Sequence, residues 1–368
     1  MIDELVHVSA SLREDGGGTA HFGRVIGRAL RRFASRRGLA FRGLHLPAGD
    51  GHPALDGYES FGGLRLRLAA RVAALQLGPR RRRRLFLFDH PGPARIQGRL
   101  PVSWRSRYAV WILGIDVWRE LPADLSRSLA AADRVIAISG VTVERARPFL
   151  PSDCRIEVVH PGIEDSGGAG AVSQAQLQAA GAGFVLIVSR LPGQERYKGH
   201  DELIEAWPSV LAGVPAARLV VAGAGDDRGR LEARVRDLGL TEAVAFLGFV
   251  DPPTLAELYR RAAVFAMPSR DEGFGLVFVE AMAAGKPCLA LAGTAPAEIV
   301  VDGETGRLIP AGRPELLAEA LASLLGDPQG ARRLGEAGRQ RFEREFTQAA
   351  FEARLEPLLD RLVVAGRD

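Results

Sequence analysis

The sequence predicts an α/β protein built from two doubly wound, mostly parallel sheets. The chain has 368 residues, which is more than one small core usually holds. Strand-like and helix-like segments alternate along its first half. The alternation starts again after a segment rich in Gly, Ala, Ser and Gln at residues 163–183. We therefore expect two similar sheets with a cleft between them, and ligands beyond the carboxyl ends of their strands.

In the first half, short apolar runs predict buried strands and longer amphipathic stretches predict helices. A charged glycine turn is expected at residues 13–18, between the first strand and the first helix. The predicted strands cover residues 4–10, 39–46, 84–88, 108–113 and 134–138. The predicted helices cover residues 19–37 and 64–77, the second with an apolar stripe at Leu64, Leu68, Val72 and Leu75.

The second half repeats the pattern after a linker that has room for a short helix. Helices are expected at residues 201–211 and 228–238, and the chain from Pro314 onward is expected to be mostly helical. The predicted strands cover residues 184–188, 217–222, 243–247, 264–267 and 288–291. The predicted domains are residues 1–165, residues 166–346 and a terminal helix within residues 347–368.

Composition predicts a globular protein of a reducing cytoplasm. Apolar residues make up 47% and charged residues 25% of the chain, and no apolar run approaches the ~18 residues of a membrane span. The N-terminus carries Asp3 and Glu4 and lacks the basic-then-apolar pattern of a signal peptide. The only cysteines, Cys154 and Cys288, do not form a disulfide framework.

Charge is unevenly distributed. Residues 1–165 hold 26 arginines and 17 acidic residues, a net charge of +9, while residues 166–368 have a net charge of −5. A run of five arginines, Arg80, Arg81, Arg82, Arg83 and Arg84, precedes a predicted strand. It predicts peripheral contact with anionic lipid at the inner face of a membrane, at ~1 kcal/mol per charge, or with a phosphorylated acceptor. A solvated loop explains the run equally well. Nucleic acid is not expected, since no aromatic residues are interleaved.

Two glutamates lie eight positions apart around a glycine turn, in the segment of residues 271–280. The turn follows an apolar strand and opens a short helix at residues 276–284, which Gly285 and Pro287 end. Such a turn aims backbone N–H groups and the positive end of a helix dipole at one spot, which suits a diphosphate. Glu272 and Glu280 could then accept hydrogen bonds from hydroxyls on either side. The alternative is that both acids only stabilise the helix N-terminus.

Arg190 and Lys198 also lie eight positions apart, just after a predicted strand. Only two of the 48 basic residues are lysines, and Lys198 is one of them. Two fixed cations aimed at a departing diphosphate would bind more tightly as negative charge grows on it. Alone, the two residues could equally be surface cations near a loop.

Gly16, Gly17 and Gly18, after the first strand, are a second phosphate candidate, with a plain flexible turn as the alternative. His21 occupies the last position of a Gly-x-Gly-x-x-Gly pattern, and no acid ends the second strand. Both observations argue against a nicotinamide enzyme. No Cys/His cluster has metal spacing and no Asp-x-Asp motif occurs, so no metal or other cofactor is expected.

Taken together, the motifs of the second half resemble the retaining glycosyltransferases of family 4, which have the GT-B fold of two facing Rossmann-like domains separated by a cleft. The resemblance rests on the order of the segments at residues 188–191, 196–200, 220–225, 246–250, 271–280 and 301–306. It implies a metal-independent hexosyltransferase that moves a hexose-type sugar from a UDP- or GDP-sugar to an acceptor, in envelope polysaccharide or glycolipid synthesis. The acceptor would be held mainly by residues 1–165, and the terminal helix would cross back to that domain.

The resemblance also implies the roles of individual residues. Arg190 and Lys198 would contact the diphosphate, and Glu272 would contact hydroxyls of the transferred sugar. Phe274, Gly275 and Leu276 would offer backbone N–H groups to the phosphates, while Glu280 would hold the ribose.

Two positions depart from the family pattern. Leu113 stands where many relatives carry a histidine near the donor sugar, and residues 293–298 replace a common Gly-Gly turn. His90, after another strand, is a weaker candidate for a cleft residue. A sugar-nucleotide epimerase, a glycogen-type phosphorylase and a non-catalytic nucleotide-sugar-binding protein therefore remain alternatives.

Overall fold

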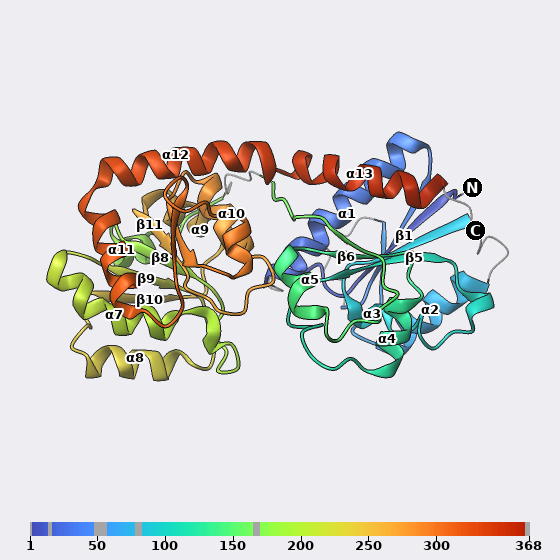
Figure 1. Ribbon diagram of the computed structural model, residues 1–368, viewed down its shortest axis with the longest axis horizontal. Helices are drawn as coiled ribbons and strands as arrows, with labels where there is room; N and C mark the ends of the chain where they lie inside the picture. Colours follow the sequence, from blue (N-terminus) through green and yellow to red (C-terminus); the bar gives the residue numbers. More distant parts are fainter. Residues whose placement is uncertain (1, 14–16, 48–56, 78–82, 165–169, 365–368) are drawn as a thin grey trace. The chain divides into compact units, whose positions relative to one another are not determined.

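The computed structural model describes residues 2–13, 17–47, 57–77, 83–164 and 170–364. The chain divides into two compact units (Figure 1). The first unit comprises Met1–Ile163 together with Gln348–Asp368, and the second comprises Glu164–Thr347. Gly16 and Arg80, Arg81 and Arg82 lie outside the described residues.

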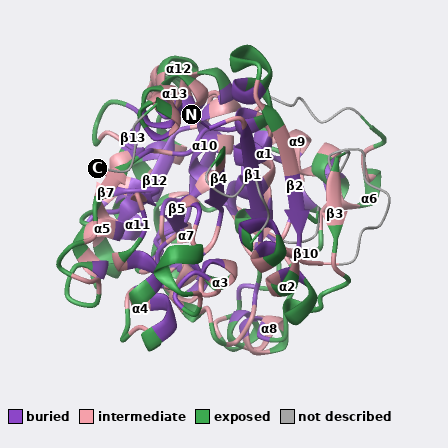
Figure 2. Cartoon of the chain, turned by 90° about the vertical axis from the view of Figure 1, so that its right-hand side faces the viewer, coloured by how far each residue is buried: buried purple, intermediate pink, exposed green. Residues whose placement is uncertain are grey.

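The first unit contains a seven-stranded sheet in the order β3-β2-β1-β4-β5-β6-β7, with parallel pairing throughout. Its central strands are apolar on both faces, which fits a parallel sheet covered on both sides. Figure 2 shows these strands as buried. The strands are β1 (Glu4–Ser9), β2 (Ala40–His45), β3 (Tyr58–Ser60), β4 (Arg84–Phe88), β5 (Arg107–Ile112), β6 (Arg134–Ala137) and β7 (Ile156–Val158).

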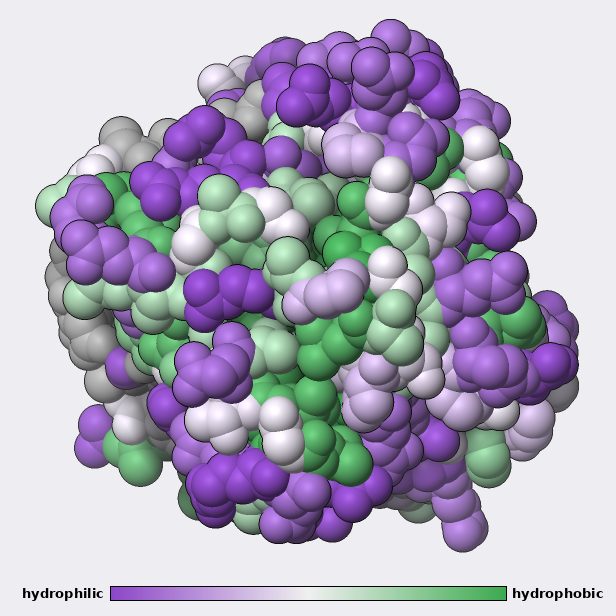
Figure 3. All heavy atoms as spheres, turned by 90° about the vertical axis from the view of Figure 1, so that its left-hand side faces the viewer, coloured by the Kyte–Doolittle hydropathy of each residue, from purple (hydrophilic) through white to green (hydrophobic). Residues whose placement is uncertain are grey.

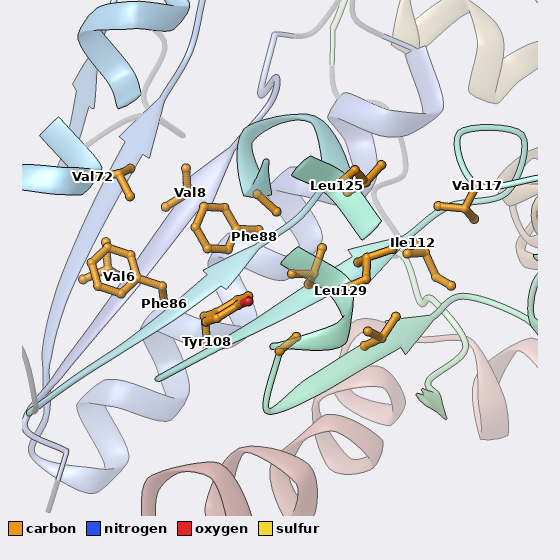
Figure 4. Close-up of a cluster of buried hydrophobic side chains, with 14 of the residues drawn as sticks. Val6, Val8, Val72, Phe86, Phe88, Tyr108, Ile112, Val117, Leu125 and Leu129 are labelled. Atoms are coloured by element: carbon orange, nitrogen blue, oxygen red, sulfur yellow. The ribbon is translucent and has the colours of Figure 1, made fainter. Parts of the chain in front are cut away.

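Helices and short 3-10 turns connect and cover this sheet. They are α1 (Gly17–Arg37), α2 (Arg65–Leu77), α3 (Pro91–Ala94), η4 (Val102–Trp104), α4 (Ala123–Ala130), α5 (Gly140–Ala146) and α13 (Gln348–Val364). One core cluster forms where α2 and α4 meet the strands, and Figure 4 shows Phe86, Phe88 and Tyr108 projecting into it. The apolar stripe predicted for α2 is present at Leu68, Val72 and Leu75, which are buried, whereas Leu64 precedes the helix and is exposed.

The C-terminal helix α13 packs against α1 of the first unit (Figure 1). Phe351 of α13 is fully buried, with ring centroids 5.8 Å from Phe22 and 6.0 Å from Trp111. Ion pairs border this contact, including Arg32 with Glu352 at 2.9 Å and Arg37 with Asp360 at 2.7 Å. Thus the first unit is assembled from both ends of the chain.

The second unit contains a six-stranded parallel sheet in the order β10-β9-β8-β11-β12-β13. The strands are β8 (Val185–Val188), β9 (Leu219–Ala222), β10 (Val244–Gly248), β11 (Val264–Ala266), β12 (Cys288–Leu291) and β13 (Gly306–Ile309). The helices are α6 (Gln174–Ala180), α7 (His200–Gly213), α8 (Arg228–Asp237), α9 (Pro252–Arg261), α10 (Leu276–Ala283), α11 (Pro314–Gly326) and α12 (Pro328–Glu345), with 3-10 turns η5 (Arg196–Lys198) and η6 (Ala295–Glu298).

The predicted class, α/β with two doubly wound parallel sheets, is confirmed. Helix α6 is the short helix for which the linker had room. Figure 3 shows one face of the molecule, where charged and polar side chains are mixed with apolar ones. Among the described residues, no helix is long and apolar enough to cross a membrane.

Candidate functional site

The candidate site lies at the carboxyl ends of β8 and β11, which are neighbours in the sheet of the second unit. β8 leads into the loop that carries Arg190 and ends in the turn η5, which carries Lys198. β11 leads into the loop that carries Glu272 and opens helix α10. Since the two strands are parallel and adjacent, their loops emerge side by side.

Lys198 and Glu272 join these two loops. The Lys198 ammonium group donates a hydrogen bond to Oε1 of Glu272, and the two side chains are only 16% and 14% exposed. Next to this pair, the backbone N–H of Arg270 donates to the carbonyl of Tyr197 at 3.0 Å. The sequence prediction that these residues converge on one place is therefore met for Lys198 and Glu272, although their roles toward a ligand stay predictions.

Arg190 has a different partner. Its Nη2 atom donates to Oε1 of Glu195 at 2.8 Å, and its side chain is 66% exposed. Tyr197 lies close to the Lys198 ion pair and is influenced by the charges of the Arg190 pair. The Lys198 ammonium is 5.0 Å from the centre of its ring. Burial raises the pKa of the Tyr197 hydroxyl, and the charges of Glu195 and Glu272 raise it further while Arg190 opposes them.

A network of ion pairs anchors the turn η5. Arg196 donates to Asp227 at 3.0 Å, and Arg230 bonds both Asp227 and Asp201, with shortest contacts of 2.6 Å to each. These partners lower the pKa of Asp227, chiefly through the hydrogen bond from Arg230. A rigid anchor of this kind fixes where Lys198 can reach.

His200, directly after this turn, opens α7 and supports the loop of Arg190. Its Nε2 atom lies 3.1 Å from Oγ of Ser189, the residue before Arg190. Burial, with a contribution from Lys198, lowers the pKa of His200 to about 4. His200 is therefore neutral near pH 7 and adds no positive charge to the site.

The start of α10 has the geometry that the glycine turn predicted. Gly275 has φ = 102° and caps the helix, and Leu276 is the first helical residue. A Cβ atom at Gly275 would lie 2.8 Å from Cδ2 of Phe278. Phe274 is buried and packs on Phe346, with ring centroids 6.1 Å apart. Its side chain therefore anchors the turn, and only the backbone of this segment can serve a ligand.

Glu280 lies one turn into α10 and is partly exposed. Tyr259 of α9 donates a hydrogen bond to its Oε2 atom at 2.9 Å. The surrounding protein raises the pKa of Glu280 to about 7, because burial disfavours the charged carboxylate, and the bond from Tyr259 only partly offsets this. The sequence did not single out Tyr259, because its contact with Glu280 depends on how α9 packs beside α10.

The first unit holds the remaining predicted residues. Gly17 and Gly18 form the first residues of α1, so the helix begins two residues earlier than predicted. A Cβ atom at Gly18 would meet nothing within 4 Å, so the space on that side of its Cα is open. His90 caps α3, with its Nδ1 atom accepting from the N–H of Gly92 at 2.9 Å. The Leu113 N–H donates to the carboxylate of Asp116 at 3.3 Å.

The two described members of the arginine run have internal partners. Arg83 pairs with Asp3 at 2.8 Å, while Arg84 is 12% exposed and pairs with Glu4 at 2.5 Å. The Nη1 atom of Arg84 also donates to the carbonyl of Leu75 at 2.6 Å. The inclusion of Arg84 in a membrane-contact surface was therefore wrong, because its guanidinium is held within the fold. Contact through the other arginines stays a prediction.

Comparison with known proteins identifies the second unit. The family described as "Glycosyl transferases group 1" matches residues 172–341. Most of the second unit therefore resembles the group 1 glycosyl transferases, and the family resemblance predicted from the motifs is confirmed. The candidate site described above lies wholly within the matched residues.

A curated relative and two solved structures show the same likeness. The GDP-mannose-dependent alpha-(1-6)-phosphatidylinositol monomannoside mannosyltransferase of Mycolicibacterium smegmatis is 34% identical over 239 residues. That match covers 60% of this chain and 61% of the relative, so this chain spans about three fifths of the relative's length.

Sucrose-phosphate synthase from Thermosynechococcus elongatus superposes with a TM-score of 0.76 at 22% identity, covering 99% of this chain and 100% of that one. HepE from Anabaena, in complex with UDP and glucose, superposes with a TM-score of 0.74 at 18% identity, covering 97% and 99%. At these identities the likeness shows the fold alone, and it confirms the predicted GT-B fold class. The cleft between the two units stays a prediction.

Proposed function

We propose that this protein is a retaining glycosyltransferase that moves a hexose-type sugar from a nucleoside diphosphate-sugar to an acceptor. The observation that carries the proposal is the meeting of Lys198 and Glu272 beside the N-terminus of α10 within the residues that match the group 1 glycosyl transferases. The donor would be a UDP- or GDP-sugar. The curated relative is named for GDP-mannose, and HepE was solved with UDP and glucose, so both bases are carried forward.

In the proposed reaction, the bond between the anomeric carbon and the departing phosphate oxygen breaks, and negative charge grows on the diphosphate. Lys198, Arg190 and the N-terminus of α10 would stabilise this charge as it develops. They supply the positive charge that a metal ion supplies in other transferases, so we propose a metal-independent reaction. Glu272, which is an acceptor of hydrogen bonds only, would hold hydroxyls of the sugar.

Retention of configuration requires that the acceptor oxygen bonds to the anomeric carbon on the face that the phosphate leaves. The acceptor proton would pass to the departing phosphate oxygen, which leaves the nucleoside diphosphate as the second product. Leu113, with no titratable side chain, cannot take this proton. The predicted N-terminal domain, residues 1–165 with a net charge of +9, would bind the acceptor. A glycolipid acceptor fits this charge and the name of the curated relative.

The test is donor turnover by Lys198→Ala and Glu272→Ala, with Lys286→Ala as the matched control. Lys286 is the only other lysine of the chain, and its ammonium donates to the carbonyl of Arg260 at 2.8 Å, at the end of α9 that precedes β11. We expect a loss of transfer of about 10² or more in both site variants and little change in the control. Circular dichroism and thermal unfolding would establish that each variant is folded.

The outcome also separates the alternatives. A folded Lys198→Ala or Glu272→Ala variant with near-full activity would contradict the role proposed for that residue. Conversion of the nucleotide-sugar without any acceptor would indicate an epimerase. Tight donor binding with no product from any acceptor would indicate a non-catalytic binding protein.

A further inference from the structure

Glu195 is a carboxylate at the candidate site that neither the motif pattern nor the proposed chemistry uses. It lies at the N-cap of η5 and accepts a hydrogen bond from Arg190 at 2.8 Å. The Glu195 side chain is 18% exposed, whereas that of Arg190 is 66% exposed. The carboxylate is thus largely enclosed, while the guanidinium that it neutralises remains accessible from solvent.

The second cation of the site is arranged differently. Lys198 and Glu272 are both largely enclosed, at 16% and 14% exposure. The charges of Glu195 and Glu272 both act on the Tyr197 hydroxyl, and the Lys198 ammonium is 5.0 Å from the centre of the Tyr197 ring, so both ion pairs lie near this residue. An anion that arrives from solvent therefore meets Arg190 as the more accessible cation, and it must compete with Glu195 for it.

We propose that Glu195 is an exchangeable counter-ion of Arg190: it holds the guanidinium in the ligand-free protein, yields it to the diphosphate and takes it back as the nucleoside diphosphate leaves. This inference rests on the proposed function, because it needs Arg190 to contact the diphosphate. Glu195 is then a residue that sets the affinity for the released product. Its effect is to weaken retention of the product without removing the cation that stabilises its charge.

The effect of Glu195 on the affinity for a nucleoside diphosphate can be measured. Exposed ion pairs contribute about 0.2–1 kcal/mol, and the upper part of this range, about 0.4–1 kcal/mol, means that removal of the pair should tighten binding of a nucleoside diphosphate by about two- to fivefold. A nucleoside monophosphate, which offers one phosphate fewer to Arg190, should change less. If Glu195 acts only through Arg190, the gain should vanish when Arg190 is absent, whereas simple repulsion between Glu195 and phosphate would persist.

The experiment is titration calorimetry of UDP, GDP, UMP and GMP with the full chain and four variants: Glu195→Gln, Arg190→Ala, the double variant and the control Glu257→Gln. Glu257 is 19% exposed and pairs at 2.6 Å with Arg260, which is 70% exposed. Glu257 also accepts a hydrogen bond from Arg261 at 2.6 Å, so it matches Glu195 in burial and in having an exposed arginine as one of its partners. It lies on α9, near the end of the helix that precedes β11, and so away from the carboxyl ends of the strands.

We expect Glu195→Gln to bind the preferred diphosphate two- to fivefold more tightly, Arg190→Ala to bind it more weakly, and the double variant to match Arg190→Ala. Unchanged or weaker binding by Glu195→Gln would overturn the inference while leaving the proposed function intact. An equal gain in the double variant would also overturn it, in favour of repulsion. Failure of the proposed function would look different, since the wild type would then bind neither diphosphate, and both proposals would fall.

Discussion

Glu280 combines partial access to solvent with a carboxyl group whose pKa is about 7, well above its ordinary value of 4.5. The protonated form is therefore abundant in the folded protein near neutral pH. In the unfolded chain, the same carboxyl group loses its proton near pH 4.5. Between these two values the folded state binds more protons than the unfolded state, so stability must fall as the pH rises.

Replacement of Glu280 by Gln should remove this fall in stability. We expect the free energy of unfolding of the wild type to drop by 1–3 kcal/mol, as an order of magnitude, relative to Glu280→Gln between about pH 4.5 and 7.5. Urea unfolding of both proteins across this range measures the difference. In Tyr259→Phe the pKa of Glu280 in the folded protein should rise further, because the bond that lowers it is gone, and the fall should extend to higher pH. If the free energy of unfolding changed with pH in the same way in the wild type and in Glu280→Gln, the raised pKa of Glu280 would be contradicted.

At the residue level, the sequence could predict which side chains gather but not how they are paired. Arg190, Lys198 and Glu272 each follow a strand end, and parallel strands bring such positions to one edge of a sheet. The counter-ion Glu195 is only five positions from Arg190, yet many acids lie that close to an arginine. Tyr259 is 21 positions from Glu280, and their contact follows from helix packing that no local spacing encodes.

Helix α10 depends on a glycine cap at its first turn. Gly275→Ala should destabilise the second unit by about 1–3 kcal/mol, because φ = 102° is strained for alanine and the new Cβ would lie 2.8 Å from Phe278. The same change should weaken the binding of a nucleoside diphosphate. Gly303→Ala is the matched control. Gly303 has φ = 72°, but a Cβ there meets nothing within 4 Å.

Urea unfolding and calorimetry with UDP or GDP measure both effects. The control should lose part of the stability and none of the affinity. If Gly275→Ala bound the diphosphate as the wild type does, the backbone of this turn would have no part in the site.

Elements with fully buried apolar runs were predicted most closely. Strands β4 and β12 begin and end at the predicted residues, because parallel strands covered on both faces read as continuous apolar segments. Strands β3 and β7 lie at the edges of their sheet, have three residues each and include Glu59 and Glu157. Such short polar segments carry no alternation that distinguishes them from loops, so they were not predicted.

At the scale of the whole molecule, α13 supplies core residues to a unit whose other residues lie at the opposite end of the sequence. Phe351→Ala should destabilise the first unit by about 3–5 kcal/mol, because it leaves a cavity beside Phe22 and Trp111. The second unit should be unaffected. Hydrogen exchange measured by mass spectrometry resolves the two units separately.

A matched substitution in α13 tests whether the effect comes from the buried ring. Arg361→Ala removes a half-exposed side chain that pairs with Glu157 at 2.5 Å, and it should cost less than about 1 kcal/mol. Equal loss of protection in both units after Phe351→Ala would show that they do not unfold independently.

The return of the chain to its first unit bears on the order in which the protein is made. Residues 164–347 form one uninterrupted segment, so the second unit has all of its parts as soon as that segment has left the ribosome. The first unit begins synthesis earlier but lacks the helix that covers Phe22 and Trp111 until residues 348–364 have left the ribosome. The half that is translated first is therefore the half that is completed last, and a nascent chain arrested before residue 348 would display an uncovered apolar surface to chaperones.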